Sequence, residues 1–257
     1  MSTDLPRYLQ LLWGVETPGR RGPKPGQSIE SIGRAAVHIA DTNGLDAVSM
    51  KAVAHEVGMT TMSLYRYLDS RDQLSEVMLH CAYGRPAAGL TATGSWRKRL
   101  ERWCLAIADL ILAHPWTVRV PMNGPPRTPN ILRWTDAGLR ALSPTNLTEK
   151  QKLSALLAAD GYVRSHVSQS LQIGAVGPAA GPDQVQWDIA SLLDEETFPA
   201  LVAAAPAIED DDDDFFTDEL AFGLTLVLDG IERLIERNGG TGSSRQKAAT
   251  AKTPQTM

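Results

Sequence analysis

A cluster of hydroxyl-bearing and basic side chains between residues 49 and 71 is the part of this sequence best equipped for chemistry. Lys51 and Arg71 can neutralise phosphates, and threonine and tyrosine hydroxyls can hydrogen-bond to phosphate oxygens. The methyl groups of Thr61 and Met62 can contact the methyl group of thymine. These residue types predict contact with a nucleic acid. The members between the two basic residues are Thr60, Thr61, Met62, Ser63, Tyr65 and Tyr67.

Two short helical patterns on either side of Gly58 must position this cluster. The apolar stripe of the first is Ala52, Val53, Ala54 and Val57, and that of the second is Met62, Leu64, Tyr65 and Leu68. Isolated helices below about 12–15 residues are marginal in water, so the two must pack against each other and a third element. A short helix, a turn containing glycine and a second short helix form a helix-turn-helix, whose second helix suits the major groove of DNA. The alternative for Tyr65 and Tyr67 is that they only pack the small core.

Two further helices complete a predicted domain at residues 28–86. The first begins at the N-cap Ser28 and ends at Asn43-Gly44, with apolar residues at three- and four-residue spacing. The second begins after Ser70, which forms a capping box with Gln73. The domain is expected to bury the backs of the two short helices.

The chain begins with a leader at residues 1–27, which we expect to be flexible and basic. Its segment GRRGPKPG, at residues 19–26, is too rich in glycine and proline to fold. There Arg20, Arg21 and Lys24 either follow a phosphate backbone or enter a minor groove, or they belong to a disordered tail without contacts. Earlier apolar residues favour a short amphipathic turn or helix; they are Leu5, Leu9, Leu11, Leu12 and Trp13.

The segment from 95 to 238 is predicted to be a second, larger helical domain, and 239–257 a disordered tail. The last helix of this domain, Phe215 to Asn238, is apolar on more than one side. Packing in the core of a single chain would therefore leave part of its apolar surface uncovered. Together with the helix at residues 148–173 it is expected to form a four-helix bundle across a two-fold axis. The predicted dimer interface is Leu220, Leu224, Val227, Leu228 and Ile231.

The second domain is also rich in aromatic residues, which suggests a pocket for an aromatic or lipophilic effector. The hypothesised lining is Trp103, Ile107, Trp116, Met122, Trp134 and Tyr162. The alternative for each of these residues is a place in the apolar core.

Composition and charge narrow the function classes. The 257-residue chain carries a net charge of −5, but thirteen acidic residues and no basic one fall between Asp183 and Glu219, which leaves 17 acidic and 25 basic residues elsewhere. A local basic footprint is therefore compatible with the net charge. The sequence has no GxSxG, HExxH, GxxxxGK[ST] or paired CxxC motif, so we expect no catalytic residue, metal or cofactor. We also expect a cytoplasmic protein without a membrane contact and with two buried free thiols, Cys81 and Cys104.

The run GLDAVSMKAVAHEVGMTTMSLYRYLDSRDQL resembles the DNA-binding domain of the TetR family of transcriptional regulators, most specifically in LYRYL-x-S-R-x-x-L. The later segment FGLTLVLDGIERLI is similar to the closing helix of the tetracycline-repressor-like C-terminal domain. The resemblance implies an all-α fold, with an N-terminal helix-turn-helix domain followed by a larger ligand-binding and dimerisation domain.

The resemblance also implies roles for individual residues. Base contacts fall on Lys51, Thr61, Met62 and Tyr65, and phosphate contacts on Ser49, Thr60, Tyr67 and Arg71. Three positions depart from the family pattern: Tyr67 stands where histidine is usual, Leu68 where phenylalanine is common, and Met62 is bulkier than usual. The implied protein is a homodimeric repressor that binds a palindromic operator in double-stranded DNA and is released by a small-molecule effector. The alternative is a helical small-molecule-binding protein or adaptor, whose first domain is only a packing module.

Overall fold

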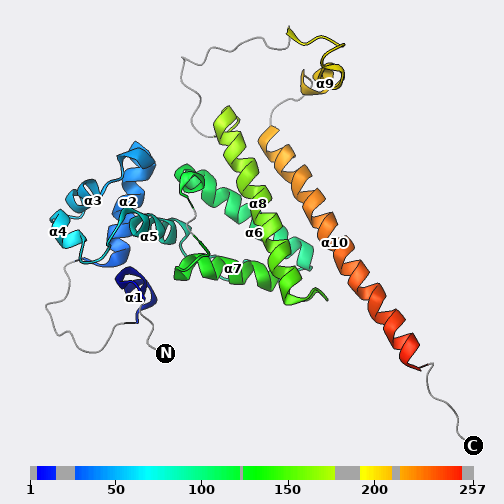
Figure 1. Ribbon diagram of the computed structural model, residues 1–257, viewed down its shortest axis with the longest axis horizontal. Coiled ribbons are helices and arrows are strands. Elements are labelled where there is room, and N and C mark those ends of the chain that lie inside the picture. The colour runs from blue at the N-terminus through cyan, green and yellow to red at the C-terminus, as the bar shows by residue number, and fades with distance from the viewer. Residues whose placement is uncertain (1–4, 16–26, 122–123, 177–191, 210–214, 251–257) are drawn as a thin grey trace, which may run out of the picture.

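The computed structural model describes residues 5–15, 27–121, 124–176, 192–209 and 215–250, and these are helical with irregular connections and no strand. Figure 1 shows a smaller group of helices near the N-terminus and a larger group that ends in one long helix. This arrangement confirms the predicted all-α fold. The helices are α1 Arg7–Trp13, α2 Ile29–Asn43, α3 Met50–Glu56, α4 Thr61–Leu64, α5 Arg71–Tyr83, α6 Trp96–Ala113, α7 Pro129–Leu142, α8 Glu149–Ile173, α9 Pro199–Glu209 and α10 Phe215–Thr250, with 3-10 turns η1 Leu45–Ala47 and η2 Pro115–Arg119.

The smaller group is held together by the packing of α2 on α5, which Gly33 permits. A Cβ atom at Gly33 would lie 2.4 Å from the Cys81 Sγ atom and 2.8 Å from a Val77 methyl group. Any side chain at position 33 would therefore force Cys81 and Val77 to move. Leu64 and Leu68 are fully buried in the same core, as predicted. The N-cap side chains of α2, α3, α4 and α5 each accept a hydrogen bond from their own first turn.

The leader contains the short helix that its early apolar residues favour. Residues 7–13 form α1, whose Tyr8, Leu9 and Leu12 side chains are buried in the core of the smaller group. The Tyr8 hydroxyl donates a hydrogen bond of 2.7 Å to the Glu76 carboxylate on α5. Apolar burial thus orders the first part of the leader. The part rich in glycine and proline, with its basic residues Arg20, Arg21 and Lys24, lies outside the described residues.

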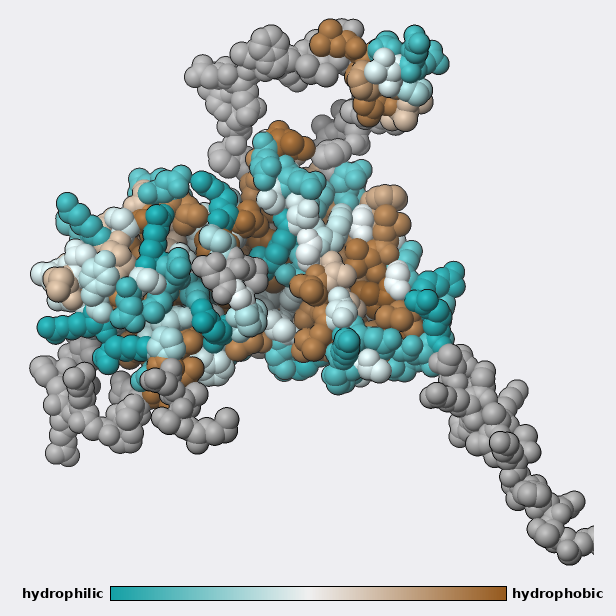
Figure 2. Space-filling model, viewed as in Figure 1, coloured by the Kyte–Doolittle hydropathy of each residue, from teal (hydrophilic) through white to brown (hydrophobic). Residues whose placement is uncertain are grey.

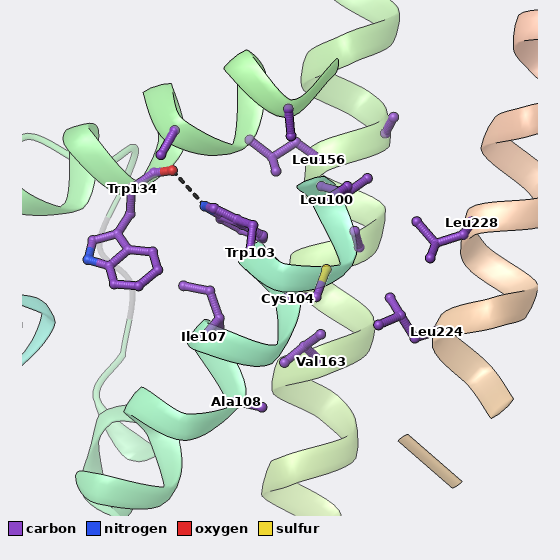
Figure 3. Close-up of a cluster of buried hydrophobic side chains, with 14 of the residues drawn as sticks. Leu100, Trp103, Cys104, Ile107, Ala108, Trp134, Leu156, Val163, Leu224 and Leu228 are labelled. Carbon is purple, nitrogen blue, oxygen red and sulfur yellow. Dashed lines mark hydrogen bonds between the residues drawn. The ribbon is translucent and has the colours of Figure 1, made fainter. Parts of the chain in front are cut away.

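The larger group packs α6, α7, α8 and α10 around one apolar core (Figure 3). Trp103 on α6 donates a hydrogen bond of 2.8 Å from Nε1 to the carbonyl oxygen of Trp134 on α7. Leu224 and Leu228 of α10 point into the same core. Both cysteines are free, and burial raises the pKa of the Cys104 thiol to about 12 and that of the Cys81 thiol to about 11, so both remain protonated.

The two groups are joined by one buried and one partly buried polar contact. Asn130 at the start of α7 donates its backbone N–H to Nδ1 of His80 on α5, at 3.3 Å. Burial lowers the pKa of His80, so its ring stays neutral and can accept this hydrogen bond. On the other side, Trp116 of η2 donates from Nε1 to the Asp41 carboxylate of α2, at 2.6 Å. Helix α5 therefore belongs to the smaller group while contacting the larger one.

The last helix is longer than the sequence pattern predicted. We expected it to end at Asn238, before Gly239-Gly240, but α10 continues to Thr250. A glycine in a helix is only about 1 kcal/mol less favourable than an alanine, so Gly239 and Gly240 do not prevent the helix from continuing. The next proline in the sequence is Pro254. Residues 239–250 of the predicted disordered tail are thus helical, and 251–257 lie outside the described residues.

Candidate nucleic-acid interface and effector cavity

The candidate nucleic-acid surface is formed by α3, α4 and the turn between them. Gly58 adopts a φ of +70°, a backbone conformation that glycine reaches without strain, and the Met59 N–H closes the turn on the Ala54 carbonyl oxygen at 2.9 Å. Val53 and Ala54 of α3 and Leu64 of α4 are buried. Because these apolar residues face inward, the polar residues between them must face solvent.

Three of the four predicted base-contacting residues are exposed on this surface. Met62 is 77% exposed and Tyr65 is 45% exposed, although both carry large apolar side chains. Lys51 is exposed, and Thr61 at the start of α4 is half-buried. An exposed methionine and tyrosine next to a lysine contribute little to the core, which leaves them available for the edges of bases.

The predicted phosphate-contacting residues have more varied roles. Ser49 and Thr60 are the N-cap residues of α3 and α4, and their hydroxyls accept hydrogen bonds from the Ala52 and Ser63 N–H groups, both at 3.1 Å. The Ser49 hydroxyl keeps its own proton for a further acceptor, whereas the Thr60 hydroxyl also shares a hydrogen bond of 2.9 Å with the Ser63 hydroxyl. Arg71 is exposed at the first position of α5.

Tyr67 has a structural role as well. It is half-buried, and its hydroxyl donates to the Gln27 carbonyl oxygen at 3.1 Å, which fixes the point where the leader enters the domain. The predicted leader contacts Arg20, Arg21 and Lys24 lie outside the described residues. Sequence reasoning missed one exposed cation on the same surface, Arg66, which stands between Tyr65 and Tyr67 in the motif itself.

A cavity of about 350 Å³ lies where α5 meets the larger group. Its walls come from α5, from η2 and the proline-rich segment after it, and from α7 and α8. The described residues with apolar side chains that line it include Leu79, Val118, Val120, Pro121, Pro126 and Ile131, and the polar ones include Glu76, Tyr83, Arg127, Thr128, Arg164 and Ser168. A ligand here would touch α5, whose first residue is the predicted phosphate contact Arg71.

The charged groups around the cavity are paired with one another. Glu76 accepts hydrogen bonds from Arg127 and from the Tyr8 hydroxyl, and the Trp13 Nε1 atom donates to the Arg127 carbonyl oxygen at 3.0 Å. On the opposite side, Arg164 contacts the Asp160 carboxylate at 2.7 Å. It also donates to the Tyr83 hydroxyl.

The effector-binding residues predicted from sequence lie elsewhere. Trp103, Ile107 and Trp134 are buried in the core of the larger group, and Trp116 is buried against the smaller one. Tyr162 donates to the Glu219 carbonyl oxygen at 2.7 Å and packs against Gly223 of α10. None of these five lines the 350 Å³ cavity, and Met122 lies outside the described residues.

The predicted dimer residues are also mostly internal, while a neighbouring apolar surface is exposed. Four of the five lie inside the chain's own core, namely Leu220, Leu224, Leu228 and Ile231, and Val227 is half-buried. Their side chains are therefore already covered. Exposed apolar residues instead occupy α8 and α10, at Leu153, Leu157, Phe222 and Leu226. In Figure 2, apolar surface gathers over this side of the molecule.

The fold and these surfaces define a class: an all-helical protein with a helix-turn-helix surface, joined through α5 to a larger helical domain with a cavity. Within the described residues no helix is long and apolar enough to cross a membrane. Two family models match, "Bacterial regulatory proteins, tetR family" over residues 32–78 and "Tetracyclin repressor-like, C-terminal domain" over residues 88–235.

Relatives and solved structures agree with these matches. The chain is 33% identical to the HTH-type transcriptional repressor DrrR1 of Streptomyces coeruleorubidus over 247 residues, covering 93% of this chain and 90% of that protein. Its fold is similar to a possible TetR family transcriptional regulator from Streptomyces coelicolor A3(2) (TM-score 0.60, 25% identity, covering 80% of this chain and 100% of the other). It is also similar to the Streptomyces coelicolor TetR family protein ActR in complex with (S)-DNPA (TM-score 0.65, 23% identity, covering 81% and 98%).

The chain belongs to the TetR family. It is a DNA-binding transcriptional regulator, as the sequence resemblance implied.

Proposed function

We propose that this protein is a homodimeric repressor that binds a palindromic operator through α3 and α4 and leaves it when an effector occupies the cavity beside α5. The observation that carries the proposal is the position of α5, which lines the cavity with Glu76, Leu79 and Tyr83 and begins with the exposed Arg71, which we propose as a phosphate contact. One rigid helix thus connects the two sites. The protein would act in the cytoplasm, where bacterial operators are found, and the proposal assigns it no catalytic step, metal or cofactor.

In the DNA contact, the exposed side chains of Lys51, Met62 and Tyr65 would meet bases. Arg71 and the N-cap hydroxyls of Ser49 and Thr60 would contact phosphates. We propose Arg66 as an additional phosphate contact, because it is exposed beside them. Two copies of this surface would occupy successive major grooves, about 34–36 Å apart on one face of the DNA.

Release requires that the effector bind the DNA-free conformation more tightly than the DNA-bound one. A ligand between α5, α7 and α8 can do this by moving α5 relative to the larger group. The polar contacts of α5 with Arg127 and Asn130 would have to adjust in such a movement. The change in α5 would then alter the separation of the two nucleic-acid surfaces in the dimer.

A second arrangement, in which the first domain is only a packing module, is not favoured by the exposed residues of α3 and α4. In a domain that only packs against another, large apolar side chains are expected in the core. Here Met62 is instead 77% exposed and lies on the same helical segment as the exposed Tyr65. For the dimer we propose the exposed residues Leu153, Leu157, Phe222 and Leu226 as the interface. They form two pairs at i,i+4 spacing, one on α8 and one on α10, as a four-helix bundle requires.

A fluorescence anisotropy titration with DNA from upstream of the protein's own coding region tests the proposed function. We expect binding whose affinity falls steeply with salt, because each neutralised phosphate releases counterions. For about six phosphate contacts the affinity should fall by about three orders of magnitude between 50 and 200 mM salt. Unrelated DNA of the same length is the control. Equal affinity for both DNAs would contradict specific operator recognition.

A further inference from the structure

One side chain at the cavity lacks a hydrogen-bond partner that its position would normally supply. Thr128 is 1% exposed, and its Oγ1 atom is the single buried side-chain nitrogen or oxygen without a partner in the described part of the chain. It is the N-cap residue of α7, yet it makes no side-chain cap hydrogen bond. The N-cap serines and threonines of α2, α3, α4, α5, α6 and α8 all make one.

Other polar groups that line the same cavity have unused hydrogen-bond donors. The Tyr83 hydroxyl accepts from Arg164 and keeps its own proton, and burial raises the pKa of Tyr83, which keeps that proton in place. The Ser168 hydroxyl accepts from Gln172 at 3.2 Å and also retains a proton. The N-terminus of α7 adds a positive partial charge. A ligand group that matches these walls is therefore a hydrogen-bond acceptor.

The ligand should also be uncharged. Arg127 is paired with Glu76, and Arg164 with Asp160, so a buried ionic group would find no free counter-charge and would be poorly solvated. Much of the remaining wall is aliphatic, including Leu79, Val120 and Ile131. These walls suit a mostly apolar ligand that contains a ring system and one polar group.

We propose that the effector is a neutral, ring-containing molecule with a carbonyl-type acceptor oxygen, and that the Thr128 hydroxyl donates a hydrogen bond to this oxygen. The Oγ1 atom has less than 1 Å² of accessible surface, so the ligand must displace the cavity wall at Thr128 to reach it, but the hydroxyl has no existing hydrogen bond to break. The inference rests on the proposed function, because it names the chemistry of the effector that occupies the same cavity.

Three tricyclic probes of one skeleton test this inference: 9-fluorenone, fluorene and fluorene-9-carboxylate, titrated by equilibrium dialysis against the full chain. We expect the wild-type protein to bind fluorenone about tenfold more tightly than fluorene, because one good hydrogen bond raises the affinity by about that factor. The carboxylate should bind more weakly than fluorenone. Thr128→Val should bring fluorenone and fluorene to within about twofold of each other, since valine keeps the shape and removes the donor. Thr135→Val, on the same helix but outside the cavity lining, should keep the preference.

Thr128→Val should also unfold at the same temperature as the wild type or a higher one, because it removes an unpaired buried hydroxyl. Lack of binding by all three probes, equal binding of fluorenone and fluorene, or a preference that persists in Thr128→Val would overturn the inference. Tightest binding of the carboxylate would show an anion site instead. Operator binding without probe, measured in parallel, separates the two claims: its loss from the wild type contradicts the proposed function, whereas a failed probe series leaves it intact.

Discussion

Alanine at both Lys51 and Tyr65 is expected to weaken operator binding by about 100-fold or more while the protein remains folded. Base contacts of this kind contribute about 1–3 kcal/mol each, so two together correspond to roughly 30-fold to 10⁴-fold in affinity. Both side chains are exposed and contribute little to the core, whose members on these helices are Val53, Ala54 and Leu64. Anisotropy titration measures the affinity, and a thermal unfolding curve checks the fold.

The matched control for the double variant is Arg233→Ala, which removes a cation that is 81% exposed on α10, far along the chain from α3 and α4. It changes the net charge by the same amount as Lys51→Ala but should leave the operator affinity within about twofold, since surface substitutions away from a site have small effects. Operator affinity equal to that of the wild type in the Lys51→Ala/Tyr65→Ala variant would refute the assignment of α3 and α4 as the DNA-reading surface.

Leu157→Asp is the second change for which we expect a large effect, the loss of the dimer and with it most of the operator affinity. Leu157 is 72% exposed on α8, so a charge there costs the single chain little. In the proposed four-helix bundle the same charge would be buried without a partner. A monomer holds one half-site only, and losing the linkage between two half-sites typically costs about 10²–10⁴ in affinity.

Sedimentation equilibrium or light scattering measures the molecular mass of the Leu157→Asp variant, and fluorescence anisotropy measures its affinity for the operator. Leu105→Asp is the comparison, because Leu105 is also an exposed leucine, at 43%, but lies on α6 outside the α8 and α10 surface. We expect Leu105→Asp to remain a dimer. A Leu157→Asp protein that is still dimeric at micromolar concentration would place the subunit interface elsewhere.

The helix-turn-helix could be predicted from sequence because its signals are local. Gly58 must adopt a positive φ, Ser49 and Ser70 are caps recognisable by residue type, and the apolar spacing of Val53, Leu64 and Leu68 fixes which side is buried. Each of these constraints acts over a few residues, so the sequence pattern determines the structure directly. The same spacing also placed Met62 and Tyr65 in the apolar stripe of the second helix, but both are exposed, and only Leu64 and Leu68 of that stripe reach the core.

The cavity and the subunit surface could not be predicted in this way because they depend on contacts between distant segments. The Glu76–Arg127 pair spans 51 residues, and the Tyr8–Glu76 hydrogen bond beside it spans 68. Aromatic residues such as Trp103 were predicted to line a pocket because of their size, but large apolar side chains fill cores as readily as they line cavities. Likewise, α10 is apolar on two sides, and only its packing on α8 shows that Leu224 faces inward and Phe222 outward.

The central claim is that two copies of the α3 and α4 surface read DNA, and selection of bound sequences from a random DNA library tests it most directly. We expect enrichment of an inverted repeat whose half-site centres lie one helical turn of DNA (about 10 bp) or a multiple of it apart. Recovery of no enriched sequence, or of a single site without two-fold symmetry, would contradict it.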